Sequence, residues 1–372
     1  MKFQLLDIIA HQPNPVTGRQ VSAAERLAQT LFLARRAEER GFDAFAVGER
    51  HAGPFLSSSP VAILGAIAAS TSRIRLQTGV TVLSLLDAFR VAEDYATIDQ
   101  LSRGRLEITI GKGNELAHFP LFGLQAAEQY ELLTEKYELL RELWSREEVD
   151  WSGRYRPSLL GATSQPRPYA GPIRIWHGSA TSRTAVELAA RWGDPLFSAN
   201  AIQPLEAYQE LIAHYFEEYE LHGHDPAGAY VGAGSGAGGL FLADSAREAK
   251  RQFGPVYEGL VTARNVPGNN TPFRSIDHAI AEGPALVGTA EQVAEKILRF
   301  HDAFSHDLQS ISLPSTVPLE QQLDILEGFA TEVIPAVRAK VTTTLWEEGD
   351  PYAGRPAFAG GKAGVPLLLS GV

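Results

Sequence analysis

The feature that most constrains the fold is a regular alternation of short apolar runs with longer amphipathic segments. Each apolar run has the composition of a buried β-strand, and the segment after it has apolar residues at helical spacing. This alternation is typical of a parallel sheet with crossover helices. Eight such units predict an α/β fold, a (β/α)8 TIM barrel. The predicted strands are residues 3–9, 44–47, 74–78, 106–110, 173–176, 196–199, 239–243 and 308–313.

Capping signals mark where the helices begin and end. Ser22, with Glu25 three residues later, is a predicted N-cap, and Gly41 is placed to end the same helix. Pro60 occupies the first-turn position that proline favours. The predicted helices begin near residues 22, 59, 87, 126, 182, 204, 289 and 319.

The length requires insertions. A barrel of this type typically needs about 250 residues, whereas the chain has 372. We expect insertions after strands 4, 5 and 7, in residues 112–125, 147–172 and 255–285, the last of them a lid. Residues 1–340 are predicted to form one barrel domain. Residues 341–372 are predicted to be an extended C-terminal tail that packs on a neighbour.

Composition excludes several function classes. The formal charge is −11, from 33 Lys and Arg against 44 Asp and Glu, which argues against nucleic acid or an anionic membrane as partner. The chain has no cysteine, which excludes disulfides, thiolate nucleophiles and cysteine-ligated metals. No histidine and carboxylate spacing resembles a metal site. The first residues lack the pattern of a signal peptide, so a cytoplasmic protein is expected.

Two predicted loops have the composition of an anion-binding site. One is a Gly-Lys-Gly-Asn turn after the fourth strand, and the other opens the fifth helix with hydroxyl residues. Because strands 4 and 5 are barrel neighbours, we expect the two loops to face each other across one gap. Each loop taken alone is equally compatible with a tight turn or a helix N-cap. The candidate residues are Lys112, Gly113, Asn114, Gly178, Ser179, Thr181 and Ser182.

A candidate acid–base group follows the second strand. Glu49, Arg50 and His51 stand at its carboxyl end, where a histidine beside a carboxylate is suited to proton transfer near neutral pH. The alternative is an ion pair between Glu49 and Arg50 with a merely hydrogen-bonded His51. His11 and His177 are placed similarly, with less support.

At these residues the chain resembles the bacterial luciferase-like, flavin-dependent monooxygenase family. The resemblance covers nearly all of residues 1–340 and is densest over 42–123. It implies a βα-barrel that binds reduced FMN at the carboxyl ends of the strands. The matching segments are the 49–51 loop, AED at 92–94, DQLSRGR at 99–105, Phe122-Gly123, 178–194 and 285–297.

The resemblance also implies roles for individual residues. Lys112 falls at the family's basic phosphate contact, and Ser182, with Ser179 and Thr181, falls in its phosphate turn. Gly79-Val80 matches the place of a non-proline cis peptide under the flavin ring. The chain departs from the family in two places: Arg50 replaces a histidine, and Gly111 replaces a cysteine that some members carry. The residues expected to line the flavin pocket are Leu5, Asp7, Phe45, Thr78, Val80 and Trp176.

The resulting hypothesis is an FMN-dependent monooxygenase. It would take reduced FMN from a separate flavin reductase and use oxygen on a small apolar organic substrate. One alternative is a deazaflavin-dependent hydride-transfer oxidoreductase. Another is a non-catalytic flavoprotein or partner subunit, which the arginine at position 50 keeps open.

One helix predicts an assembly. The segment from Pro60 to residue 69 is apolar on every face, whereas a helix outside a barrel should have one polar face. We therefore expect a homodimer through this helix and the helix that begins at Asp87. Cover from an insertion or from the tail is the alternative.

Overall fold

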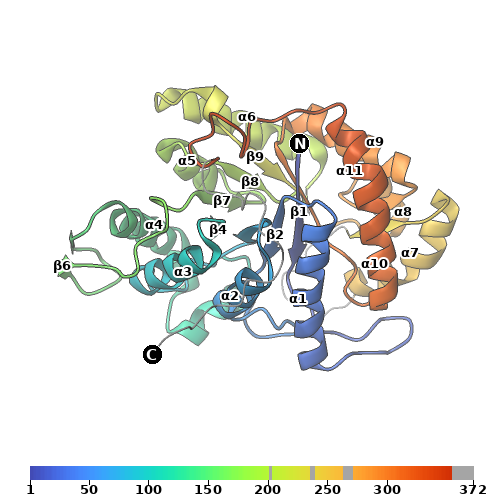
Figure 1. Cartoon of the computed structure of the whole chain (residues 1–372), viewed down its shortest axis with the longest axis horizontal. Coiled ribbons are helices and arrows are strands. Elements are labelled where there is room, and N and C mark those ends of the chain that lie inside the picture. Colours follow the sequence, from blue (N-terminus) through green and yellow to red (C-terminus); the bar gives the residue numbers. More distant parts are fainter. Residues whose placement is uncertain (201–202, 235–238, 263–270, 354–372) are drawn as a thin grey trace, which may run out of the picture.

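Eight parallel strands close into a barrel at the centre of the molecule (Figure 1). The computed structural model describes residues 1–200, 203–234, 239–262 and 271–353. Helices surround the ring of strands, so the predicted (β/α)8 architecture is confirmed. In order around the barrel the strands are β1 (Lys2–Asp7), β2 (Ala44–Val47), β3 (Arg75–Thr78), β4 (Leu106–Ile110), β7 (Ile175–Ser179), β8 (Leu196–Ser198), β9 (Val231–Ala233) and β12 (Leu308–Ile311).

The predicted helices begin within one residue of their predicted positions, except that the helix predicted from residue 126 begins at Gln129. Ser22 accepts a hydrogen bond from the N–H of Glu25, and Thr289 forms a reciprocal capping box with Gln292. The last predicted helix is interrupted by a π-turn at Phe329–Val333. The helices are α1 (Ala23–Glu39), α2 (Pro60–Ser70), α3 (Ala88–Ser102), α4 (Gln129–Ser145), α5 (Arg183–Trp192), α6 (Leu205–Leu221), α7 (Ala246–Thr262), α8 (Ile276–Ala281), α9 (Ala290–Phe304), α10 (Leu319–Gly328) and α11 (Ile334–Arg338).

The predicted seventh strand is wrong. Residues 239–243 include β10 (Leu240–Leu242), which pairs with β11 (Leu286–Gly288) in a separate two-stranded sheet. The barrel position belongs to β9, which pairs with β8 and β12. A Cβ atom on Gly232 of β9 would lie 2.6 Å from the Phe197 ring, so the close contact requires glycine. A three-residue strand with a central glycine lacks the apolar run that marks the others.

The insertions are partly as expected. The predicted insertion at residues 147–172 contains a hairpin, β5 (Val149–Trp151) and β6 (Leu159–Ala162), at the far left of Figure 1. The hairpin precedes the fifth barrel strand, β7, so its predicted place after strand 5 is wrong. The loop after β4 holds two 3-10 turns, η1 (Leu116–Phe122) and η2 (Ala126–Glu128). The predicted lid consists in part of α7 and α8, and its residues 263–270 lie outside the described residues.

Side chains alternate between two different layers along the strands. Phe3 and Leu5 point outward into the main apolar cluster beneath the helices, and the Phe3 ring lies 5.7 Å from that of Phe329. Gln4 points into the barrel and hydrogen-bonds Gln77, which donates to Glu107 at 3.3 Å. The interior is therefore polar at mid-height, and the apolar core lies between strands and helices.

The amino-terminal end of the barrel is closed by the chain's own C-terminal segment, residues 342–353. Trp346 donates from Nε1 to Glu107 Oε1 at 2.7 Å, and Trp176 donates to the other carboxylate oxygen at 2.8 Å. Leu345 packs in a buried cluster with Trp176 and Leu308. This described part of the tail thus packs on its own barrel; residues 354–372 lie outside the described residues.

Charges at this closed end are buried and matched. Glu107 is fully buried, and guanidinium groups of Arg75 and Arg174 lie 3.3 and 3.7 Å from it. Arg174 also pairs with Asp350 from the C-terminal segment, and its guanidinium carbon lies 4.2 Å from the Tyr352 ring centroid. A buried carboxylate is stable only when it is paired and hydrogen-bonded, as here.

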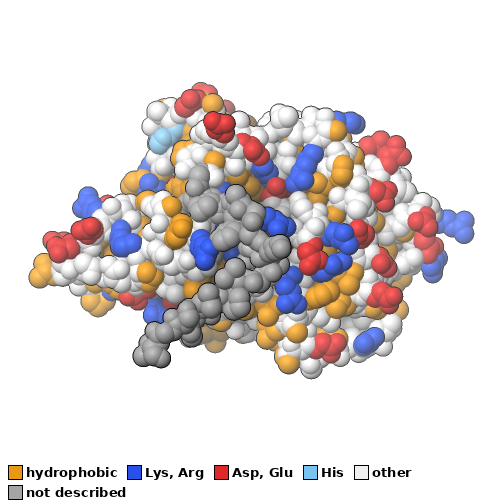
Figure 2. Space-filling view, in the orientation of Figure 1, with side chains coloured by type: hydrophobic (Ala, Val, Ile, Leu, Met, Phe, Trp, Pro, Cys, Tyr) orange, Lys and Arg blue, Asp and Glu red, His pale blue; other side chains and the backbone are white. Residues whose placement is uncertain are grey.

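The surface carries the remaining charge. On the face in Figure 2, acidic and basic side chains are interspersed. Across the described ranges, no helix combines the length and apolar content needed to cross a lipid bilayer.

Candidate active site

Glycines frame a floor at the carboxyl ends of β3, β4 and β7. Gly79-Val80 is a cis peptide bond, as the resemblance implied. A Cβ atom on Gly111 would lie 3.0 Å from Val80 Cγ2, and one on Gly178 would lie 2.8 Å from Val80 Cγ1. The Val80 side chain therefore fills the space that larger residues at positions 111 and 178 would need. The result is a small apolar platform between three strand ends.

Glu49 and His51 form a hydrogen-bonded pair beside this platform. His51 Nε2 lies 2.8 Å from Glu49 Oε1, and Glu49 Oε2 accepts the backbone N–H of Val82 at 2.9 Å. Glu49 is 5% exposed. The carboxylate thus fixes both the imidazole and the loop that carries the platform, an arrangement suited to acid–base work.

Arg50, from the predicted acid–base loop, contacts Asn114 of the predicted anion-binding loop instead of pairing with Glu49. Its Nη1 donates to Asn114 Oδ1 at 3.0 Å, and its guanidinium carbon lies 5.3 Å from the Phe55 ring centroid. Burial lowers the pKa of Arg50, and attraction to Glu115 opposes that effect. The contact with Asn114 connects the loop after β2 to the loop after β4.

His118 also lies in the candidate site, and the sequence did not reveal it. It comes from η1, is 5% exposed, and its ring centroid lies 5.8 Å from that of His51 at a nearly perpendicular angle. The ring centroid of Phe122 lies 4.8 Å from that of His51, also in an edge-on arrangement. The pKa of His118 is lowered, first by burial and then by His51. The available signal was a histidine four residues before Phe122 in a loop at the catalytic end of the barrel.

Lys112 turns toward the start of α4. Its Nζ donates to Gln129 Oε1 at 3.0 Å and to the carbonyl of Gly113 at 3.2 Å, and it lies 5.3 Å from the Tyr130 ring centroid. β4 and β7 are neighbours, as predicted, with Ile110 beside His177. Lys112 is half-buried, and both of its hydrogen-bond partners are neutral groups.

The turn before α5 is organised by its own hydroxyls. Ser179 Oγ accepts the N–H of Ser182 at 3.0 Å and donates to its carbonyl at 3.1 Å. Ser182 Oγ accepts the N–H of Ala185 at 3.2 Å and so caps α5. Thr181 is exposed. The capping role is therefore present, and a phosphate role for this turn remains a prediction.

Several residues expected to line the pocket lie elsewhere. Trp176 is at the closed end of the barrel with Glu107, and Leu5 and Phe45 point outward beneath the helices. Asp7 pairs with Arg26 at 2.5 Å. For Leu5, Phe45 and Asp7 the reason is the two-residue period of a strand, which sends every second side chain away from the interior. Trp176 does point inward, but toward the closed end of the barrel.

Thr78 and two histidines are also committed to other contacts. Thr78 Oγ1 accepts the N–H of Thr109 and donates to its carbonyl, which ties β3 to β4. His177 points out of the barrel, with Nε2 3.0 Å from Asp194. His11 Nε2 lies 2.9 Å from the carbonyl of Val21. Within the described residues, no group of histidines and carboxylates is arranged to hold a metal ion.

Comparison with known proteins assigns the family. The model of a family described as luciferase-like monooxygenase matches residues 1–307. The chain belongs to this family. Limonene 1,2-monooxygenase of Rhodococcus erythropolis is 25% identical to this luciferase-like chain over 74% of the chain and 72% of the relative.

Other similar proteins include both monooxygenases and F420-dependent dehydrogenases. A monooxygenase structure, RslO1 from Streptomyces bottropensis, is 27% identical with a TM-score of 0.77, covering 90% of this chain and 99% of that one. An F420-dependent glucose-6-phosphate dehydrogenase of Nakamurella multipartita is 32% identical over 52% of this chain. The alignment spans only 58% of that relative, so it shows shared ancestry rather than a shared activity.

Proposed function

We propose that this protein is an FMN-dependent monooxygenase that acts on a small apolar substrate with oxygen. The observation that carries the proposal is the platform around Val80, where Gly111 and Gly178 leave no room for a Cβ atom. A flat ring system needs such a low apolar surface, and the glycines let it approach the backbone. When bound, reduced FMN would supply the electrons that activate oxygen.

The chain offers suitable groups for the cofactor's phosphate. Lys112 supplies a half-buried cation at the end of β4, and Gly113 and Asn114 continue its loop. The amino terminus of α5, with Ser179, Thr181 and Ser182 after Gly178, supplies backbone N–H groups and a favourable dipole. These residues fit an anionic group between two adjacent strands.

The reaction's proton transfers are assigned to Glu49 and His51. The 2.8 Å hydrogen bond between them orients the imidazole, and because Glu49 is buried, this hydrogen bond is stronger than it would be in water. Arg50, where the family often has a histidine, holds Asn114 and so shapes the loop that carries Lys112. Arg50 is thus proposed to position the loop rather than to move protons.

Hydride transfer with a deazaflavin is the second candidate. The F420-dependent relative at 32% identity favours it. That cofactor's acidic tail would need additional cations, and in the described loops after β2 and β4 the cations are Arg50 and Lys112. The FMN hypothesis needs no more than these.

An anaerobic titration tests both candidates. We expect reduced FMN to bind tightly and reduced F420 weakly. Oxygen is then added with a panel of apolar substrates, and isotope-labelled oxygen is sought in the product. Absence of FMN binding would reject the proposal, whereas FMN binding without any product would favour the non-catalytic flavoprotein. A purified flavin reductase, added with oxidised FMN, tests the proposed supply of reduced cofactor.

A homodimer through α2 and α3 is part of the proposal. The exposed positions of α2 are Ala62, Ala66, Ala69 and Ser70, so its outer face is almost entirely small and apolar. Leu101 at the end of α3 is 58% exposed. Sedimentation should show a dimer that Ala66→Glu dissociates; a monomeric wild type would contradict it. Residence in the cytoplasm belongs to the same proposal, with cell fractionation as its test.

A further inference from the structure

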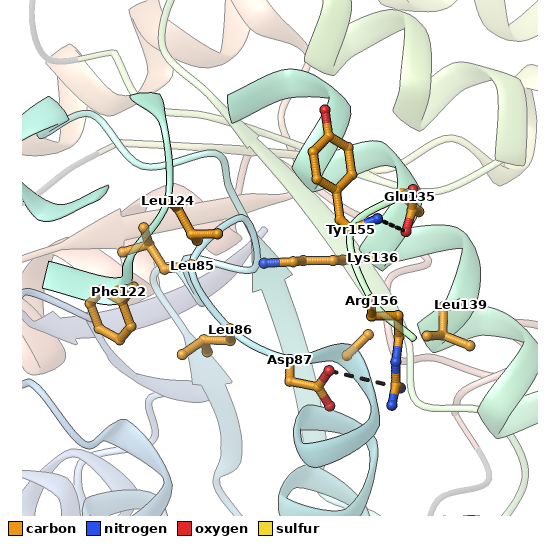
Figure 3. A pocket seen from close by; sticks show the side chains of 11 residues that line it. Leu85, Leu86, Asp87, Phe122, Leu124, Glu135, Lys136, Leu139, Tyr155 and Arg156 are labelled. Carbon is orange, nitrogen blue, oxygen red and sulfur yellow. Dashed lines mark hydrogen bonds and ion pairs between the residues drawn. The ribbon is translucent and has the colours of Figure 1, made fainter. Parts of the chain in front are cut away.

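A cavity lies near the platform, on the loop between β3 and α3. Its volume is about 170 Å³, several times the ~30 Å³ share of one water molecule. Its walls come from the loop between β3 and α3, from η1, from α4 and from the β5–β6 hairpin segment (Figure 3). Leu85 belongs to a buried cluster with Val82 and Phe119, against which Val80 packs. This apolar wall separates the cavity from the proposed flavin platform.

Lys136 is the distinctive group in this cavity. Its Nζ donates one hydrogen bond, to the carbonyl of Ser84 at 2.6 Å, and Figure 3 shows the side chain extending into the cavity toward Leu85. Within the described residues, no carboxylate lies within ion-pair distance of its Nζ. Burial lowers the pKa of Lys136 to about 8, against the attraction of Asp87 and Glu135. Two ammonium N–H groups are thus left for another acceptor.

Arg156 provides further unused donors in the same cavity. Its Nε and Nη1 atoms are buried and have no hydrogen-bond partner among the described residues. Arg156 forms an ion pair with Asp87 at 3.8 Å (Figure 3), a separation too long for a hydrogen bond. Unsatisfied charged donors are costly to bury, so both cations are suited to an anionic acceptor.

The acidic groups of the cavity already have partners. Glu135 accepts the N–H groups of Arg154 and Tyr155 at 2.7 and 2.9 Å. Asp87 caps α3 by accepting the N–H groups of Phe89 and Arg90. The two carboxylates already offset the two cations, so a ligand with two negative charges is disfavoured, and a single carboxylate would be held by hydrogen bonds from Lys136 and Arg156 rather than by net charge.

The rest of the lining is apolar. Leu85, Leu86 and Leu139 face the space, and Phe122 stands at its exposed side, 38% accessible. We propose that this cavity binds a small monocarboxylate with a short apolar tail, its carboxylate on Lys136 and Arg156 and its tail on the leucines. This site is separate from the proposed flavin site and does not depend on it.

Calorimetric titration of the full chain, without flavin, tests the proposal. The probes are hexanoate, 1-hexanol as the uncharged match, and succinate as a dianion. Hexanoate should bind better than either match. Lys136→Met should weaken hexanoate binding about ten- to a hundredfold, the range for one lost charged hydrogen bond, and leave hexanol unchanged. Binding of hexanoate should also weaken as the pH rises above about 8, where free Lys136 loses its charge.

Two further variants locate the site. Lys136→Arg keeps the charge and should restore most of the affinity, which separates a charge effect from a folding defect. Lys112→Met should leave hexanoate binding unchanged; loss of binding in that variant would place the anion in the mouth and overturn the proposal. Equal binding by wild type and Lys136→Met, or no binding of hexanoate to wild type, would also overturn it.

Discussion

Both ends of this barrel carry a buried glutamate, but the glutamate has different partners at each end. At the amino-terminal end, Glu107 is fully buried and meets two indole N–H groups and two guanidinium groups. At the carboxyl end, Glu49 holds a half-buried His51, and beside it His118 Nε2 has no partner among the described residues. The Glu107 carboxylate finds its contacts within the protein and stabilises the closed end, although Arg174 Nη1 beside it has no hydrogen-bond partner among the described residues. The unpartnered nitrogen of His118 lies at the ligand-binding end of a barrel of this type, where it is available to a ligand. The comparison indicates that the amino-terminal end stabilises the fold, and it supports the proposal that the reaction takes place at the carboxyl end.

The largest effect is expected at the closed end. Glu107→Gln leaves Arg75 and Arg174 buried without their shared carboxylate and should cost about 3–5 kcal/mol of unfolding free energy. Denaturant unfolding measures this cost. Glu347→Gln, which removes an exposed partner of Lys2, is the control and should change stability by about 0.5 kcal/mol or less. Equal losses in the two variants would show that the buried ion pairs of Glu107 stabilise the closed end no more than an exposed pair does.

The open end should respond in binding rather than in stability. Lys112→Ala removes the proposed phosphate contact and should weaken binding of reduced FMN by about 1.5–3 kcal/mol. Its melting temperature should stay close to that of wild type, because Lys112 is bonded to a neutral amide and a carbonyl. Unchanged FMN affinity would remove Lys112 from the site.

The closed end also predicts a pH dependence, through His306 just before β12. Burial lowers the pKa of His306 to about 3 from 6.5, with His301 adding to the effect and Gln309 opposing it. Between about pH 6.5 and pH 3, His306 is protonated in the unfolded chain but stays neutral in the folded protein. Stability should therefore fall by about 1.4 kcal/mol per pH unit toward pH 3 from this group alone. In His306→Gln that slope should be shallower, and an unchanged slope would contradict the assignment.

The smallest effect concerns Ser182, where capping and cofactor binding compete as explanations. Ser182→Ala removes the cap of α5 and should cost about 1 kcal/mol of stability. Ser182→Gly should cost only a few tenths. If FMN affinity drops in both variants beyond any change in stability, the hydroxyl also serves the phosphate. If affinity follows stability, Ser182 is only a cap.

The strand positions were predictable where an apolar run lay between residues typical of turns, such as glycine. Residues 44–47 and 106–110 coincide with β2 and β4 in both bounds. Backbone placement was also predictable by resemblance, since the cis peptide at Gly79-Val80 lies where family members carry one. Chain order and period contain this information, because each buried strand must be apolar and each crossover helix amphipathic.

The direction of each strand side chain, and the contacts between segments far apart in the sequence, were not predictable. The shift of one residue that sends Leu5 outward and Gln4 inward depends on register, which no local pattern specifies here. The contact of His118 with His51 joins positions that only the folded loop after β4 brings together. For the same reason β9 was missed: Gly232 is required by the Phe197 ring of a neighbouring strand.

The closed end also dictates when this protein can finish folding. The ring closes by pairing Lys2 with Leu308, and the Met1 ammonium donates to the carbonyl of Val341, 340 positions away. A chain made from its amino end must leave β1 without its second neighbour until β12 emerges from the ribosome, and Glu107 without Trp346 for longer still. The polar interior is thus exposed throughout synthesis. The last described residues to be made complete the burial of a carboxylate carried by β4.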